Sequence, residues 1–200
     1  MKEKIIDKSV EMFLTLGFKS VTMDDIASEM GISKKTIYVH FPNKTKLIES
    51  VTMHMFDTIS CGIENICALK KNPIEEIYDI KNLVRDHLKG EKSSPQHQLQ
   101  KYYPKIFEWL KEKQFKVMNE CVKENLTRGI KLGLYRSNLN IDFIARIYFN
   151  NIVGLKDPKL FPLKDFSMNE LMDNFLEYHI RGICTEKGNK NLNQIMNNQL

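Results

Sequence analysis

The chain has 200 residues, of which 42% are hydrophobic, and a formal net charge of +5 at pH 7. This length and apolar content can supply a sizeable core in one or two domains. The charge favours nucleic acid only mildly and excludes a polybasic tail protein. Because no apolar run is long enough for a signal peptide or a membrane span, we expect a cytoplasmic protein.

Helical periodicity dominates the chain, and no segment has the alternating pattern of a convincing strand. The first predicted helix runs from Lys2 to Leu16, with Ile6, Val10 and Phe13 on one face. Gly17 follows this helix and can end it, since glycine readily adopts the left-handed conformation of a C-cap.

The next segment has the pattern of two short helices joined by a tight turn. Thr22 can cap a helix whose third residue, Asp25, reaches back to it. Gly31 can end that helix, and Ser33 can cap the following one almost at once. This arrangement is typical of a helix-turn-helix motif.

Four lysines stand at predicted helix starts, where the helix dipole disfavours positive charge. Lys34 and Lys35 follow Ser33, Lys44 and Lys46 follow Asn43, and no acid occurs from Met30 to Ile48. The pattern predicts that an anion lies between them, and a DNA backbone has suitable geometry. The prediction requires that the protein's own carboxylates leave these lysines unscreened.

The outward positions of the second short helix all carry side chains that can hydrogen-bond to bases or phosphates. They are Ser33, Lys34, Lys35, Thr36, Tyr38 and His40. Each also has a structural interpretation: the lysines as solvated surface residues, Tyr38 as a half-buried core aromatic, and His40 as a structural hydrogen-bonding group.

The run from Thr22 to Gly31, followed by Ile32-Ser33-Lys34-Lys35-Thr36-Ile37-Tyr38-Val39-His40-Phe41-Pro42-Asn43-Lys44-Thr45-Lys46-Leu47-Ile48, resembles the DNA-binding signature of the TetR family of bacterial transcriptional regulators. The resemblance implies backbone or groove contacts for Thr36, Tyr38, His40 and Lys44, and base-facing positions for Ser33, Lys34 and Lys35. With Thr22 and Lys46, these residues form the predicted DNA-binding set.

The rest of the chain is predicted to be helical as well. A long helix starts at Lys44, and Asn72-Pro73 opens another that Gly90 closes, followed by a loop from Gly90 to Pro95. Later helices are predicted up to Tyr103 and over Lys105–Leu132, Leu139–Val153 and Ser167–Cys184. We therefore predict an all-α fold of about nine helices, with a DNA-binding head in residues 1–45, an effector-binding and dimerisation body in 46–187, and a disordered tail in 188–200.

An aromatic-rich stretch around Pro104 is the predicted effector pocket, because cavities between helices are mostly apolar. Its residues are Tyr102, Tyr103, Phe107, Trp109, Phe115, Met118 and Cys121. The alternative is that they are packed core. TetR-like proteins usually bind an inducer in this domain, so the resemblance implies an unknown, largely apolar small-molecule effector.

The last two predicted helices are apolar on more than one stripe, which favours a homodimer interface. The stripes contain Phe143, Ile147 and Tyr148 on one helix and Leu171, Met172, Phe175 and His179 on the other. The alternative is that both stripes are internal core.

The sequence contains no motif that predicts an enzyme, a metal site or a cofactor. The four cysteines, at positions 61, 67, 121 and 184, lack zinc-site spacing and are expected to be free. We therefore predict a ligand-responsive regulator of the repressor type that binds a palindromic operator in double-stranded DNA as a homodimer and releases it on effector binding. The alternative is a helical ligand-binding or protein-interaction module whose head does not bind DNA.

Overall fold

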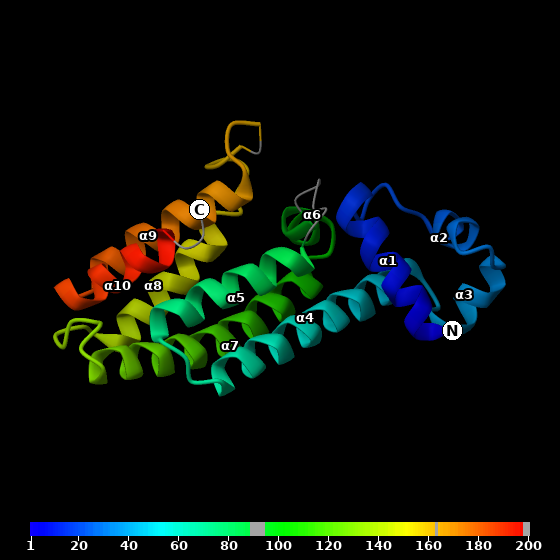
Figure 1. Ribbon diagram of the computed structural model, residues 1–200. Coiled ribbons are helices and arrows are strands. Elements are labelled where there is room, and N and C mark those ends of the chain that lie inside the picture. Colours follow the sequence, from blue (N-terminus) through cyan, green and yellow to red (C-terminus); the bar gives the residue numbers. More distant parts are fainter. Residues whose placement is uncertain (89–94, 163, 198–200) are drawn as a thin grey trace. The chain divides into compact units, whose positions relative to one another are not determined.

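The computed structural model describes residues 1–88, 95–162 and 164–197 (Figure 1). The all-α prediction is confirmed: these residues form ten helices and, outside them, only an isolated β-bridge between Tyr135 and Cys184. The helices are α1 (Lys2–Leu16), α2 (Met23–Glu29), α3 (Lys34–His40), α4 (Lys44–Ala68), α5 (Pro73–His87), α6 (Pro95–Tyr102), α7 (Pro104–Lys131), α8 (Ile141–Gly154), α9 (Met168–Ile183) and α10 (Glu186–Asn197).

The chain folds into two compact units that are not consecutive in sequence. Unit 1 comprises Met1–Ser60 and His87–Gln114, and unit 2 comprises Cys61–Asp86 and Phe115–Leu200. This differs from the predicted division at residue 45. The reason is that Leu99, Ile106 and Phe107, far along the chain, are buried in the same core as the first three helices.

In unit 1, α1, α2 and α3 pack around a core in which several side chains are almost completely shielded from solvent. Phe13, Ile26, Ile37, Phe41, Leu47 and Ile48 are each at most 2% exposed. The turn after α1 depends on Gly17, which has a φ of 84° and lies so close to the Gln98 amide that a Cβ atom would clash with it. Gln98 also accepts a hydrogen bond from the Lys19 N–H at 3.2 Å, so α6 fixes the position of this turn.

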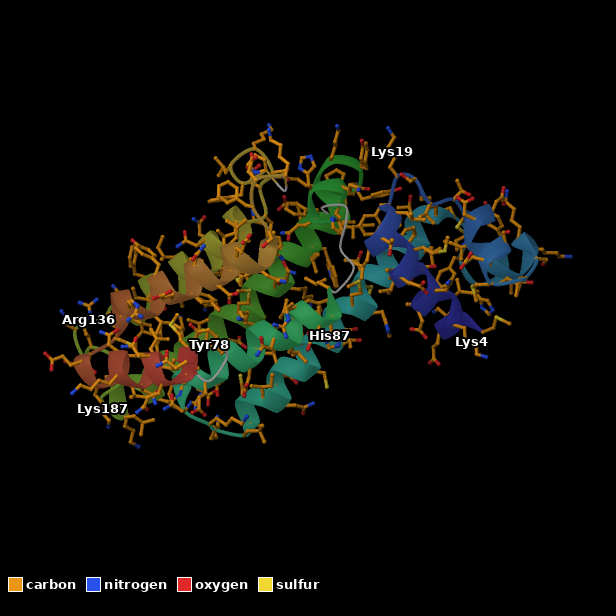
Figure 2. The ribbon with its side chains drawn as sticks, turned by 45° about the horizontal axis from the view of Figure 1, so that its top comes forward. Lys4, Lys19, Tyr78, His87, Arg136 and Lys187 are labelled. Carbon is orange, nitrogen blue, oxygen red and sulfur yellow. The ribbon has the colours of Figure 1, made fainter. Side chains whose placement is uncertain are left out.

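In unit 2, α5, the second half of α7, α8, α9 and α10 lie side by side (Figure 1). Their shared core includes Ile74, Leu126, Tyr135, Leu176, Ile180 and Leu192. Arg136 and Lys187 lie at the same end of this unit (Figure 2). The Arg136 N–H donates to the Ile183 carbonyl at 2.9 Å, and Lys187 Nζ donates to the Leu132 carbonyl at 3.0 Å, so the loop after α7 is tied to the α9–α10 junction.

The predicted disordered tail is wrong for residues 188–197, which belong to α10, while residues 198–200 lie outside the described part of the chain. Leu192 is 0% exposed and Ile195 is 9% exposed, and both pack into the core of unit 2. Their i, i+3 spacing gives the helix one apolar face. The prediction missed this face because asparagine and glutamine dominate the composition of the segment.

The predicted loop from Gly90 to Pro95 falls mostly on residues outside the described ones. Pro95 itself begins α6, and Pro104 restarts the helix as α7. Over the described ranges, no helix combines the length and the apolar character that a membrane span requires.

Candidate nucleic-acid interface

The start of α2 is held by a reciprocal capping box. Thr22 Oγ1 accepts a hydrogen bond from the Asp25 N–H at 3.1 Å, and Asp25 Oδ2 accepts one from the Thr22 N–H at 2.8 Å. The bonds from the Thr22 N–H and hydroxyl lower the pKa of Asp25. Thr22 is exposed at the head of the motif, so its position agrees with the prediction, although its hydroxyl already serves the cap.

A tight turn connects α2 to α3. Gly31 has a φ of 63°, a conformation that favours glycine, and its N–H donates to the Ser28 carbonyl at 3.1 Å. Ser33 Oγ then accepts a hydrogen bond from the Thr36 N–H at 3.1 Å and caps α3. Ile37 is fully buried, which fixes the side of α3 that faces the core and leaves the opposite side to solvent.

The prediction that no carboxylate screens the four lysines is wrong for two of them. Lys34 Nζ lies 2.7 Å from Asp24 of α2, and Lys46 Nζ lies 2.7 Å from Glu49. Glu49 directly follows the acid-free stretch from Met30 to Ile48, whereas Asp24 lies six residues before it and is brought close to α3 by the turn after α2. Both pairs are exposed, so a phosphate can compete for either lysine, but the lysine pattern alone no longer establishes a DNA site.

Lys35 and Lys44, unlike Lys34 and Lys46, form no ion pair with a carboxylate among the described residues. Lys35 is exposed. Lys44 is partly buried, and its Nζ donates to the Lys19 carbonyl at 3.4 Å. Burial lowers the pKa of Lys44, while nearby Asp25 acts in the opposite direction. Lys44 therefore braces the turn after α1, and Lys35 is the lysine most available to an external anion.

The remaining predicted contact residues gather on or beside α3. Tyr38 is 42% exposed, with Lys34 Nζ 5.9 Å from its ring centre, so it is not a core aromatic. Thr36 shares a 2.8 Å hydrogen bond with the Ser33 hydroxyl. His40 lies beside Phe41. Thr36, Tyr38 and His40 thus lie with Lys34 and Lys35 on α3, which Ser33 caps, whereas Lys44 and Lys46 lie on α4.

Val39 is a residue of this surface that the sequence prediction missed. Its side chain is 74% exposed, although valine is an apolar residue on a helix with a well-packed core side. It lies four positions after Lys35 and therefore on the same face of α3. Because apolar side chains can contact the thymine methyl group in the major groove, Lys35, Tyr38 and Val39 form a face suited to a DNA groove. Helical spacing from Lys35 could have identified it.

The predicted pocket residues do not surround one cavity. Tyr103 packs against the core of unit 1, and Phe107, 5% exposed, belongs to it. Trp109 packs edge-on against Phe56 at 5.9 Å, also in unit 1, and Tyr102 is 40% exposed. Phe115, Met118 and Cys121 belong to unit 2, where Phe115 packs against Phe149. The single-pocket prediction is therefore replaced by core packing for much of the set.

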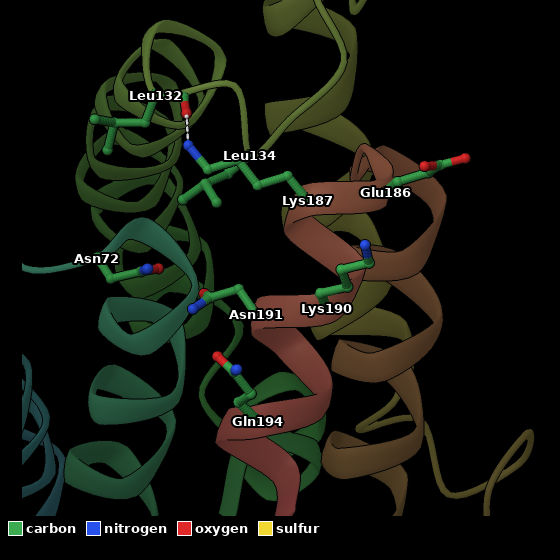
Figure 3. A pocket seen from close by; sticks show the side chains of 8 residues that line it. All are labelled: Asn72, Leu132, Leu134, Glu186, Lys187, Lys190, Asn191 and Gln194. Atoms are coloured by element: carbon green, nitrogen blue, oxygen red, sulfur yellow. Dashed lines mark hydrogen bonds between the residues drawn. The ribbon is translucent and has the colours of Figure 1, made fainter.

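An open cavity of about 610 Å³ lies elsewhere, at one end of unit 2 (Figure 3). Six of its eight lining side chains are polar or charged. The lining residues are Asn72, Leu132, Leu134, Glu186, Lys187, Lys190, Asn191 and Gln194. None of them belongs to the predicted effector pocket, and Lys187 is already bonded to the Leu132 carbonyl.

The predicted dimer residues divide into internal and external sets. Leu171, Phe175 and His179 are each less than 10% exposed within a single chain, so the prediction that they face a partner is wrong. Met172, Ile147 and Tyr148 are partly buried, whereas Phe143 is 58% exposed. Tyr178, which the sequence prediction missed, is 79% exposed on α9. The apolar stripe exists as predicted, but it faces the core, and Tyr178 lies on the other side of the helix.

Buried His179 should make the stability of the fold depend on pH. Its ring lies 5.1 Å from Tyr148 and 5.6 Å from Phe175, and burial lowers the pKa of His179 to about 4. Because an unfolded histidine has a pKa of about 6.5, the unfolded chain binds more protons between these values. The stabilisation is complete above about pH 6.5 and is lost as the pH falls towards 4. We expect about 2 kcal/mol of it to disappear between pH 7 and 5.

Urea unfolding at the two pH values measures this loss. The variant His179→Phe, which keeps a ring but cannot titrate, should lose about 2 kcal/mol less than the parent chain over the same interval. Equal losses in the two proteins would contradict the assignment to His179.

Residues 5–51 match the family model described as bacterial regulatory proteins, tetR family. The chain is 25% identical over 209 residues to the uncharacterized HTH-type transcriptional regulator YvaF of Bacillus subtilis (strain 168), covering 94% of this chain and 97% of that protein. It is also 35% identical over 72 residues to IcaR of Staphylococcus aureus (strain Newman), a negative transcriptional regulator of the biofilm operon icaADBC. That match covers 36% of this chain and 37% of IcaR.

The fold is similar to that of solved TetR-family structures. A TetR-family transcriptional regulator from Marinobacter aquaeolei VT8 superimposes with a TM-score of 0.75 at 16% sequence identity, covering 98% of this chain and 96% of that one. The matched segment contains α2, α3 and their connecting turn, which are the elements that present the exposed face described above. Residues 5–51 therefore carry the sequence pattern of the TetR family of bacterial regulatory proteins, and the chain shares the fold of a TetR-family regulator along its length.

Proposed function

We propose that this chain is a DNA-binding transcriptional regulator that acts as a homodimeric repressor. It inserts α3 of each protomer into the major groove of a palindromic operator and releases the DNA when a small molecule binds unit 2. The observation that carries the DNA-binding proposal is the exposed face of Lys35, Tyr38 and Val39 within the segment that matches the family. Repression is supported by the negative regulator IcaR, to which the chain is similar over 72 residues.

In this proposal the residues around α3 have different roles. Lys35, Tyr38 and Val39 contact the groove, while Lys34 exchanges its Asp24 partner for a phosphate. Ser33, Thr36 and Thr22 set the ends of the two helices through their capping hydrogen bonds and so position α3 for contact with the DNA strands. Lys44, Lys46 and His40 flank this face. Two such heads reach successive major grooves if they lie about 34–36 Å apart in the dimer.

The effector is proposed to bind unit 2 beside Phe115, Met118 and Cys121. The same stretch of α7 carries Asn119, whose Oδ1 atom is buried without a hydrogen-bond partner in the described structure. A ligand with an apolar body and one hydrogen-bond donor suits this surrounding, because it would satisfy the amide oxygen. To act as an inducer, it must bind the released state more tightly than the DNA-bound state.

The alternative function, a module whose head does not bind DNA, is favoured by the internal ion pairs of Lys34 and Lys46. A gel-shift experiment with the DNA upstream of the chain's own gene distinguishes the two. The proposal requires a complex whose affinity falls steeply with salt and survives excess unrelated DNA. If binding is no tighter than to unrelated DNA, the operator proposal fails.

The dimer is proposed to form through the exposed sides of α8 and α9, where Phe143 and Tyr178 stand out. Large exposed aromatic side chains on adjacent helices commonly mark an interface. In sedimentation at micromolar concentration, the parent chain should have twice the monomer mass of 23.5 kDa. Phe143→Arg with Tyr178→Arg should give the monomer mass, because it places unpaired charges in the interface. A parent chain that sediments as a monomer would refute the proposal.

A further inference from the structure

Two cysteines from distant parts of the sequence meet inside unit 2. Cys67 lies near the end of α4 and Cys121 lies in the middle of α7, 54 positions later, with their Sγ atoms 3.1 Å apart. Both are free and partly buried, whereas Cys61 is exposed and Cys184 is buried. A disulfide bond is about 2.05 Å long, so the two sulfur atoms need to approach by only about 1 Å to form one.

The surroundings give the two thiols different acidities. The hydrogen bond that the two thiols share lowers the pKa of Cys67, and the charge of Arg128 acts in the same direction. Burial and the carboxylates of Glu76 and Glu124 oppose this effect. For Cys121, the hydrogen bond to Cys67 and burial both raise the pKa. Cys67 is thus the more acidic thiol and forms a thiolate more readily than the neighbouring Cys121.

A metal site explains this pair less well than thiol chemistry does. Within residues 1–88, 95–162 and 164–197, no cluster of three or more histidine, cysteine, aspartate or glutamate side chains could hold a metal ion. Structural zinc needs four such ligands. By contrast, an accessible thiolate next to a second cysteine is the arrangement that redox-sensing proteins use.

We propose that Cys67 and Cys121 form a redox site that a hydroperoxide oxidises to an intramolecular disulfide, and that this bond changes the DNA affinity of the regulator. The Cys67 thiolate attacks the peroxide, so that an S–O bond forms, the O–O bond breaks and water (or, from an organic hydroperoxide, the alcohol) leaves after protonation. Cys121 then attacks the sulfur of the resulting sulfenic acid, so that the S–S bond forms and a water leaves. Each sulfur loses one electron, and the peroxide is reduced by two.

The consequence for DNA binding rests on the function proposed above. α4 is one continuous helix from Lys44, directly after the DNA-binding motif, to Ala68, one residue after Cys67. The disulfide would covalently fix the last turn of this helix to α7. If the DNA-bound and released states differ at the contact between α4 and α7, the disulfide stabilises one state more than the other. The equilibrium between the two states must then shift.

The first experiment maps the bond and is independent of DNA. The full chain is treated with stoichiometric hydrogen peroxide, digested without reductant and analysed by mass spectrometry. We expect a linked peptide pair containing Cys67 and Cys121 that has lost two hydrogen atoms. The link should persist in Cys61→Ser and be absent from Cys67→Ser and Cys121→Ser. In Cys121→Ser a sulfenic acid at Cys67 should be trapped by dimedone. Oxidation of Cys61 first, or sulfinic acid at Cys67 of the parent chain without a link, would overturn the site.

The second experiment compares operator affinity before and after oxidation. We expect a change of about fivefold or more in the Kd of the parent chain and of Cys61→Ser, reversed by dithiothreitol. Cys67→Ser and Cys121→Ser should show no change. A mapped disulfide with unchanged affinity would overturn the regulatory half of the proposal. A reduced chain that binds no operator would instead refute the proposed function, and the mapping experiment would still decide the redox site.

Discussion

Replacing Lys35 and Tyr38 by alanine should weaken operator binding on the order of a hundredfold, because each good interaction in a groove contributes about 1–3 kcal/mol. Both side chains are exposed on α3, and the alanine variant keeps the buried Ile37 that holds this helix in place. Folding should therefore be unaffected. Lys35→Ala alone should also reduce the slope of log K against log salt by about one if its ammonium group neutralises a phosphate. Fluorescence anisotropy over a series of salt concentrations measures both quantities.

Two matched variants test whether the effect belongs to this face. Lys159→Ala removes an exposed lysine from unit 2, has the same charge change and should leave affinity and slope unchanged. Asp24→Asn releases Lys34 from its carboxylate partner and should tighten binding if Lys34 meets a phosphate. Equal losses for Lys35→Ala and Lys159→Ala would show that only net charge matters. They would remove the assigned role of α3.

Arg128→Met should destabilise unit 2 by about 3–5 kcal/mol, because it leaves a buried carboxylate without its cation. Arg128 Nη2 donates to both carboxylate oxygens of Glu76 at 2.5 Å, and its Nη1 donates to the Lys71 carbonyl at 3.0 Å. The Glu76 side chain is only 1% exposed. The Asn125 amide, which donates to Glu76 at 2.9 Å, is neutral and cannot replace the guanidinium charge. Urea unfolding followed by circular dichroism measures the decrease in the free energy of unfolding.

The origin of this loss can be separated from simple truncation. Adding Glu76→Gln to Arg128→Met removes the buried charge and should restore part of the stability. Lys70→Met breaks the exposed Lys70–Glu124 pair and should have a much smaller effect. A double variant no more stable than Arg128→Met would mean that reduced packing, and not an unpaired charge, dominates.

Features governed by neighbouring residues could be predicted from the sequence. The capping box of Thr22 and Asp25, the Ser33 cap and the left-handed Gly31 each depend on residues within a few positions. Such local hydrogen bonds have few alternatives, so their residue types identify them. The same holds for the helix bounds near Pro73 and Pro104.

Features that depend on long-range packing could not be predicted in this way. The Lys34–Asp24 pair forms because a turn returns the chain on itself, and the sequence pattern shows only that no acid is adjacent. Helical periodicity places Phe175 and His179 on one stripe of α9, but it cannot decide whether core or partner covers that stripe. In the same way, the burial of Phe107 with the first three helices depends on residues about 60 to 100 positions away.

Each passage of the chain between the two units lies inside or at the end of a helix, after Ser60 in α4, after Asp86 in α5 and after Gln114 in α7. None of these three crossings therefore falls in a loop of the described residues at which a protease or a cloning strategy could separate the units. A gene fragment that stopped at codon 60 would encode a domain without the interior residues Leu99, Ile106 and Phe107. To exchange regulatory specificity between relatives, the buried residues of both segments of unit 1, 1–60 and 87–114, must be transferred together. Joining two gene fragments at a single splice point is insufficient.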